Sequence, residues 1–173
     1  MKKNKTDIRY KNFIQKDYLN KNKKIIKKYS DILKKITYNL DNDKDIFHSL
    51  SKKFTLNFKY QDLHKFRKFN TVVIIGMGGS ILGSEAIYFF LKKKINKNFI
   101  FLNNIDEEKL ENLKKQHKLD KTLFVIVSKS GNTIETLSNM GALKLIKNKR
   151  KNIIVISEKK DNFLFSLSKK MKY

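Results

Sequence analysis

Hydrophobic residues in the first part of the chain recur with the period of a helix. Before Asn70, apolar residues such as Ile25, Tyr29 and Ile32 stand three or four positions apart, with lysines between them. A polar break at residues 41–45 interrupts this pattern, which resumes near residue 46. We therefore predict an N-terminal helical segment over residues 1–70, which covers another layer and has no chemistry of its own.

A different pattern begins at residue 71, where short continuous apolar runs alternate with stretches of helical spacing. Continuous runs of Val, Ile, Leu and Phe are typical of strands buried on both faces of a parallel sheet. The order βαβαβαβ, with right-handed crossovers, predicts an α/β fold with a doubly wound parallel sheet of strand order 2-1-3-4. The predicted strands are residues 72–75, 99–102, 123–127 and 153–156, and the predicted helices are residues 81–94, 106–117 and 134–149.

A glycine-rich stretch, GMGGSILGS at residues 76–84, lies between the first predicted strand and its helix. Glycine lets a ligand approach the backbone because it has no Cβ, and a helix N-terminus attracts anions. The dinucleotide pattern GxGxxG fails at Ile81, and the Walker pattern lacks its lysine after Gly83. The stretch is therefore either another kind of anion-binding loop or a tight turn between strand and helix.

A second polar loop, SKSGNT at residues 128–133, follows the third predicted strand and leads into another helix. Asn132 and Glu135 have the spacing of a capping box, which accounts for part of this pattern. In a sheet of order 2-1-3-4 the first and third strands are neighbours. Both loops are therefore expected to face one crevice at the carboxyl edge of the sheet.

The two loops together have the donors to surround one phosphate group. These donors are glycine amides and the hydroxyls of Ser80, Ser128, Ser130 and Thr133. Neither loop contains an acidic residue that would hold Mg²⁺ against the phosphate. We therefore predict a phosphorylated metabolite that is held by its phosphate rather than one that undergoes phosphoryl transfer.

The net charge of +24 suggests a nucleic acid partner, but the composition does not support one. Only three of the 40 basic residues are arginine, the residue whose bidentate fork reads bases. The lysines are spread along the chain and proline is absent, as expected for compositional drift. We expect a solvated lysine surface and no nucleic acid partner; lysines gathered on one face would favour the nucleic acid alternative.

The chain contains no cysteine and three scattered histidines, so we expect no disulfide, no metal site and no cofactor. No apolar run approaches the roughly 18 residues of a membrane span, and no uninterrupted apolar stretch follows the N-terminus. We therefore expect no membrane partner and a cytoplasmic location.

The loops resemble those of the sugar isomerase (SIS) fold and, within it, the glucose-6-phosphate isomerase family. Residues 76–83 are similar to the first glycine-rich loop of that family, residues 128–136 to its phosphate loop, and residues 157–162 to the stretch after its fourth strand. The family's proline after Asn162 is replaced here by Phe163. The resemblance implies substrate contacts from Gly79, Ser80, Ser128, Lys129, Ser130, Gly131, Asn132 and Thr133.

The resemblance also implies an activity. Members of the family interconvert glucose 6-phosphate and fructose 6-phosphate through an enediol, in glycolysis and gluconeogenesis, and the full-length enzyme is a homodimer. Their catalytic glutamate, histidine and lysine belong to sequence that would follow Tyr173, with a second SIS domain. We therefore expect this chain to be the N-terminal part of such an enzyme, inactive alone, with residues 71–173 as an SIS domain whose sheet is incomplete and truncated at its C-terminus.

No catalytic residue is assigned in this chain. Glu158 follows the fourth predicted strand at the ligand-binding edge, but a solvated loop glutamate is the preferred interpretation. His48, His64 and His117 are interpreted as capping or packing residues. The alternative function is a free-standing SIS module that binds a sugar phosphate and regulates a partner.

Overall fold

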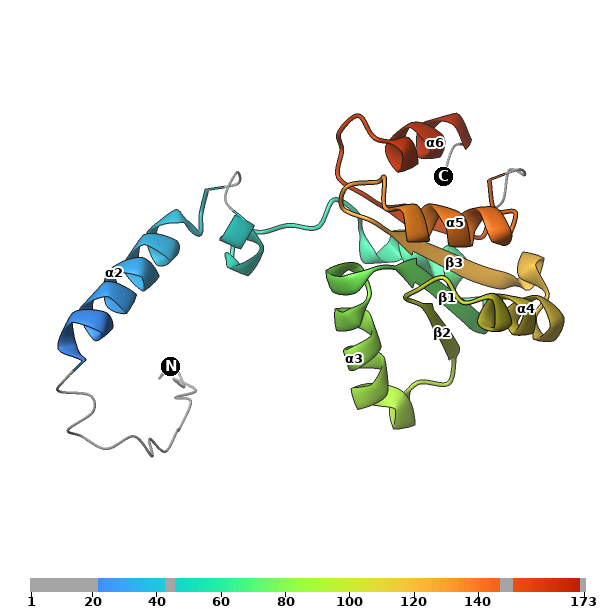
Figure 1. Ribbon diagram of the computed structural model, residues 1–173, viewed down its shortest axis with the longest axis horizontal. Coiled ribbons are helices and arrows are strands. Elements are labelled where there is room, and N and C mark those ends of the chain that lie inside the picture. The colour runs from blue at the N-terminus through green and yellow to red at the C-terminus, as the bar shows by residue number, and fades with distance from the viewer. Residues whose placement is uncertain (1–21, 43–45, 147–150, 172–173) are drawn as a thin grey trace. The chain divides into compact units, whose positions relative to one another are not determined.

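The computed structural model describes residues 22–42, 46–146 and 151–171 (Figure 1). The chain divides into two compact units, Met1–Phe58 and Lys59–Tyr173. The described part of the first unit contains helix α2 (Lys23–Asn39) and the 3-10 helix η1 (Ile46–Leu50), in agreement with the helical pattern. None of the α2 side chains is buried. The earlier part of the predicted helical segment lies outside the described residues.

The second unit is built on a four-stranded, all-parallel sheet with the order β2-β1-β3-β4. This order confirms the predicted α/β doubly wound sheet, and each predicted apolar run lies in a strand. Continuous Val, Ile and Phe suit these strands because helices cover both faces of the sheet. The strands are β1 (Thr71–Gly76), β2 (Asn98–Leu102), β3 (Thr122–Val127) and β4 (Ile153–Ile156).

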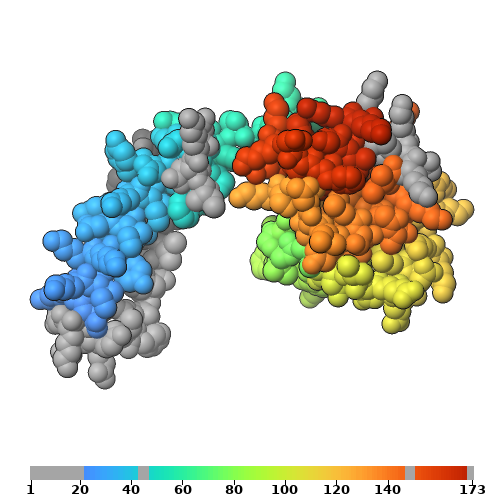
Figure 2. Space-filling model, turned by 45° about the horizontal axis from the view of Figure 1, so that its top comes forward, coloured from blue at the N-terminus to red at the C-terminus, as the bar shows by residue number. Residues whose placement is uncertain are grey.

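Three helices cover one face of the sheet: α4 (Glu107–Gln116), α5 (Ile134–Ala142) and α6 (Phe163–Met171). Figure 2 shows them side by side in yellow, orange and red. Their apolar side chains, such as Leu110 and Leu164, form one core with alternate residues of the strands. The polar loop of residues 128–133 leads into α5, the middle helix of this layer.

The opposite face is covered by α3 (Leu82–Leu91) and by the 3-10 helix η2 (Tyr60–Phe66). The short 3-10 helix η4 (Lys92–Lys94) completes the predicted helix of residues 81–94. Ile81, directly before α3, is fully buried against the sheet. Because α3 follows β1 and α5 follows β3, the two helices leave neighbouring strands toward opposite faces, as the predicted crevice requires.

Helix α5 ends at Ala142, so the helix predicted for residues 134–149 is wrong for residues 143–146. The Leu145 N–H donates to the Met140 carbonyl at 3.0 Å and the Lys144 N–H donates to the Gly141 carbonyl at 2.9 Å, which is a Schellman turn. Lys144 has a φ of 53°, a conformation that usually requires glycine. A lysine gave no sequence signal for this turn, and residues 147–150 lie outside the described residues.

Lys144→Gly is expected to stabilise the second unit by about 1 kcal/mol, because relief of left-handed strain exceeds the entropy that glycine loses on folding. Lys115→Gly, inside α4, is the matched control and should destabilise by about 1 kcal/mol because the position is helical. Urea unfolding of both variants measures the two changes. Destabilisation by both substitutions would contradict the left-handed turn.

Candidate functional site

The two predicted loops begin side by side at the carboxyl edge of the sheet. Strands β1 and β3 are paired along their length, and Gly76 at the end of β1 lies opposite Val127 at the end of β3. A Cβ at Gly76 would lie 2.9 Å from the Val127 carbonyl oxygen, so the close approach of the strands requires glycine there. The topology therefore places the starts of both loops on neighbouring strand ends.

The first loop turns sharply between β1 and α3. Gly78–Ser80 forms the 3-10 turn η3, in which the Ser80 N–H donates to the Met77 carbonyl at 3.0 Å. Gly78 has a φ of 50°, so the turn itself favours glycine at this position. A Cβ at Gly79 would meet nothing within 4 Å among the described residues. Packing within the chain therefore gives no reason for glycine at position 79.

The second loop gathers its three hydroxyl side chains. Thr133 Oγ1 lies 2.9 Å from Ser128 Oγ and 3.4 Å from Ser130 Oγ. Ser128 Oγ also accepts the Gly131 N–H at 3.1 Å. Ser128 is only 2% exposed, whereas Ser130 is exposed and Thr133 is half-buried. Ser128 therefore supports the loop from inside, and Ser130 and Thr133 present the hydroxyls that a ligand can reach.

The hydroxyl cluster lies at the N-terminus of helix α5. Thr133 is the N-cap residue, and its side chain makes no capping hydrogen bond to the first turn of the helix. The first N–H groups of a helix carry a partial positive charge and attract anions. Lys129, in the same loop, is exposed and adds a positive charge. The chemistry of this corner therefore suits an anion.

The predicted capping box of Asn132 and Glu135 is wrong. Asn132 Oδ1 accepts the N–H of Phe163 at 3.0 Å, so this side chain caps α6 rather than α5. Asn162, immediately before α6, accepts the N–H of Phe165 with its own Oδ1 at 2.9 Å. The replacement of the family's proline by Phe163 supplies the N–H that Asn132 binds, because proline has none. Helix α6 therefore begins with side-chain acceptors from two different loops.

Gly131 lies where these two loops meet. It has a φ of 67°, and a Cβ at this position would lie 1.8 Å from Asn162 Oδ1. Its carbonyl accepts the Leu164 N–H at 3.1 Å. Gly131 is among the predicted binding residues, whereas Asn162 is not. The sequence signal for Asn162 is its position directly before a stretch of helical spacing, because asparagine is a preferred N-cap residue.

Glu158 lacks the properties of a tuned general base. Its Oε1 lies 2.9 Å from Lys160 Nζ. The hydrogen bond from Lys160 holds the pKa of Glu158 below its ordinary value. A general base at neutral pH is instead favoured by a raised carboxylate pKa. This geometry supports the interpretation of Glu158 as a solvated loop residue.

Side-chain contacts support a structural role for two of the three histidines. His48 Nδ1 lies 2.9 Å from the Leu40 carbonyl oxygen within the first unit. The His64 ring packs edge-on against Tyr60 with centroids 5.6 Å apart, and His117 follows the last turn of α4. Across the described ranges, no three carboxylate or histidine side chains are grouped to hold a metal ion. The helices described in those ranges are too short or too polar to cross a bilayer.

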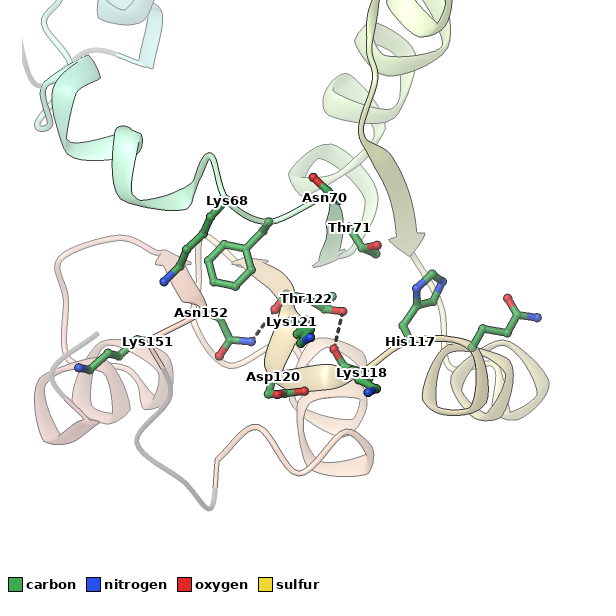
Figure 3. Close-up of a pocket in the computed structure, with 12 residues that line it drawn as sticks. Lys68, Asn70, Thr71, His117, Lys118, Asp120, Lys121, Thr122, Lys151 and Asn152 are labelled. Atoms are coloured by element: carbon green, nitrogen blue, oxygen red, sulfur yellow. Dashed lines mark hydrogen bonds between the residues drawn. The ribbon is translucent and has the colours of Figure 1, made fainter.

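A surface hollow of about 700 Å³ lies at the opposite, amino edge of the sheet (Figure 3). Lys68, Lys118 and Lys151 line it, together with the 3-10 helix η5 (Leu119–Lys121). Thr71 and Thr122, the first residues of β1 and β3, also line it, so it lies at the far end of the strands from both loops. Exposed lysines alone do not define a specific site, and we place the candidate site at the carboxyl edge.

Comparison with known sequences identifies the family. The family model of phosphoglucose isomerase matches residues 11–168. The glucose-6-phosphate isomerase of Borreliella burgdorferi (strain ZS7) is 43% identical over 105 residues, which are 54% of this chain and 20% of that protein. That of Methanocaldococcus jannaschii is 35% identical over 119 residues, which are 67% of this chain and 27% of that protein. The chain thus spans well under half of the length of these relatives.

Solved structures agree with this result. The crystal structure of a glucose-6-phosphate isomerase from Chlamydia trachomatis matches with a TM-score of 0.50 and 32% identity, over 57% of this chain and 22% of that one. A hypothetical protein from Thermus thermophilus matches with a TM-score of 0.62 over 90% of this chain and 40% of that one, but its 20% identity shows the fold alone. Because the family model covers most of its residues, this chain belongs to the phosphoglucose isomerase family.

Proposed function

We propose that this chain supplies the phosphate-binding loops of an enzyme that interconverts glucose 6-phosphate and fructose 6-phosphate. The observation that carries the proposal is the cluster of Ser128, Ser130 and Thr133 hydroxyls at the N-terminus of α5. Neutral hydroxyls, helix N–H groups and one lysine suit a phosphate monoester. Membership of the phosphoglucose isomerase family supports a sugar as the rest of the ligand.

The hydroxyl cluster can exchange its internal hydrogen bonds for bonds to the ligand. Ser128 Oγ accepts the Gly131 N–H, which leaves its own proton for Thr133 Oγ1 at 2.9 Å. Thr133 and Ser130 then have hydroxyl protons to donate to phosphate oxygens. Lys129 adds a charge to the same loop. Charge-assisted hydrogen bonds of this kind are about twice as strong as neutral ones.

The first loop is proposed to contact the same ligand through its backbone. A Cβ at Gly79 would meet nothing within 4 Å among the described residues, so the backbone of this turn is open to the approach of a ligand. Ser80, the next residue, is half-buried and ends the 3-10 turn before α3. Because β1 and β3 are neighbours, one sugar phosphate can lie across both strand ends.

Binding of the phosphate fixes one end of the sugar, and the proton transfer of the isomerisation takes place at the other end. Glu158 is paired with Lys160 and its pKa is lowered. We therefore propose that this chain positions the substrate and that another part of the family enzyme performs the acid–base chemistry.

Thr133→Ala is expected to weaken binding of glucose 6-phosphate by roughly 1 to 3 kcal/mol, because a charged phosphate oxygen loses its donor. Isothermal titration calorimetry on the purified chain measures this change. Thr37→Ala is the matched control, since the Thr37 hydroxyl donates to the Leu33 carbonyl within α2. Unphosphorylated glucose should give no signal. Equal binding of glucose, or an unchanged affinity of Thr133→Ala, would refute the proposed role of the loop.

A further inference from the structure

The loop that follows β4 is folded around the side chain of Asn162, which is 7% exposed. Asn162 Nδ2 donates to the carbonyls of Glu158 at 3.1 Å and Lys160 at 3.2 Å. Its Oδ1 accepts the N–H of Phe165 at 2.9 Å and the hydroxyl of Ser157 at 3.4 Å. The buried amide therefore links residues 157–162 to the first turn of α6. We call residues 157–165 together the Asn162 loop.

The Asn162 loop is hydrogen-bonded to residues 128–133, which we call the phosphate loop. The Glu158 N–H donates to the Lys129 carbonyl at 3.2 Å, and the Leu164 N–H donates to the Gly131 carbonyl at 3.1 Å. In a third bond, the Phe163 N–H donates to the Asn132 side chain at 3.0 Å. Three hydrogen bonds therefore hold the phosphate loop against the Asn162 loop, so a change in the conformation of one is expected to displace the other.

The Asn162 side chain also contacts the phosphate loop directly. A Cβ at Gly131 would lie 1.8 Å from Asn162 Oδ1 and 2.2 Å from its Cγ, so the amide packs against the Gly131 Cα. The Gly131 N–H in turn donates to Ser128 Oγ, which lies 2.9 Å from Thr133 Oγ1. A chain of contacts therefore runs from Asn162 through Gly131 to the hydroxyl cluster.

We propose that Asn162 is a positioning residue for phosphate binding, which sets the geometry of the Ser128, Ser130 and Thr133 hydroxyls without touching the ligand. This inference rests on the proposed function of the phosphate loop. The proposed role requires the amide at position 162, because its Nδ2 donates hydrogen bonds and its Oδ1 accepts them. Alanine at position 162 removes the acceptor for Phe165 and both donors to the Glu158 and Lys160 carbonyls, and it adds no charge beside the phosphate loop.

Asn162→Ala tests the inference against a matched control on the far edge of the sheet. Asn152 is 5% exposed and its Nδ2 also donates to two carbonyls, those of Leu119 and Thr122. Asn152→Ala therefore removes a comparable buried amide from a place that has no bond to the phosphate loop. Both variants are expected to lose stability, so stability alone does not distinguish a positioning role from a structural one.

Affinity for glucose 6-phosphate does distinguish them, measured by calorimetry on the full chain at a temperature where every variant is folded. Asn162→Ala is expected to bind about tenfold more weakly, the effect of one poorly placed hydrogen bond, and Asn152→Ala to bind as wild type does. Wild-type affinity in folded Asn162→Ala would overturn the inference and leave the proposed function intact. A wild-type chain that does not bind would overturn both.

Hydrogen exchange on the wild-type chain provides a second test that needs no folded variant. Glucose 6-phosphate is expected to slow exchange of the Phe163, Leu164 and Phe165 amides, because binding to the phosphate loop stabilises the bonds that fasten it. The Phe124 amide, which donates to the Asn152 carbonyl, is the internal control. Slower exchange confined to the phosphate loop itself would overturn the inference.

Discussion

Gly131→Ala is expected to destabilise the second unit by roughly 3 kcal/mol, from backbone strain and overpacking together. The added Cβ would lie 1.8 Å from Asn162 Oδ1. That oxygen cannot easily move, because Asn162 is buried and its Oδ1 accepts the Phe165 N–H. The φ of 67° adds strain for any residue with a Cβ. Urea unfolding followed by circular dichroism measures the loss.

Gly79→Ala is the control for this prediction, and it is expected to change stability by less than about 0.5 kcal/mol. A Cβ at Gly79 would have no neighbour within 4 Å in the described part of the chain. The same variant is expected to bind glucose 6-phosphate more weakly, because the methyl group would occupy space next to the ligand. A Gly131→Ala variant as stable as Gly79→Ala would contradict the packing of Asn162 against Gly131.

The purified 173-residue chain is expected to bind glucose 6-phosphate without isomerising it. Enzymes accelerate their reactions by about 10⁶-fold or more, and positioning without acid–base catalysis supplies only part of that factor. Glu158, the carboxylate that follows β4 and could act as a general base, is paired with Lys160, which lowers its pKa. A coupled assay for fructose 6-phosphate, on protein from a host that lacks its own isomerase, measures the turnover.

The remaining part of a related glucose-6-phosphate isomerase, added in trans or fused to this chain, is expected to restore activity. Thr133→Ala should then lower that activity, because the substrate is held less well. Failure to restore turnover with a chain that still binds glucose 6-phosphate would favour the regulatory module. Turnover by the unaided chain would contradict the division of roles, and Glu158→Gln would then be the first variant to assay.

The strands could be predicted because each one has a local apolar pattern, and their order could be predicted from the rules for crossover connections. Runs such as TVVII at residues 71–75 and TLFVIV at residues 122–127 contain no polar residue after the first, and their short length and β-branched residues are typical of a strand buried on both faces. The handedness of the crossovers then leaves few topologies for four parallel strands. The loops could be located for the same reason, since they had to follow β1 and β3.

The interactions between loops could not be predicted from sequence. Asn132 has a suitable glutamate three residues later, yet its side chain caps α6, which begins 31 residues further along. The end of α5 depends on Lys144 in a left-handed conformation that lysine rarely adopts, and on the burial of Leu145 against the core. Both outcomes are decided by tertiary packing, which overrides the local preference.

The claim that both loops bind one phosphate is tested most directly by the amide NMR spectrum of the chain during titration with glucose 6-phosphate. A phosphate shared by both loops is expected to shift the signals of Gly78 and Gly79 in the first loop and of Ser130 and Gly131 in the second loop, with one common dissociation constant. Unphosphorylated glucose should leave these signals in place. Shifts spread evenly over the surface lysines, or confined to one of the two loops, would contradict it.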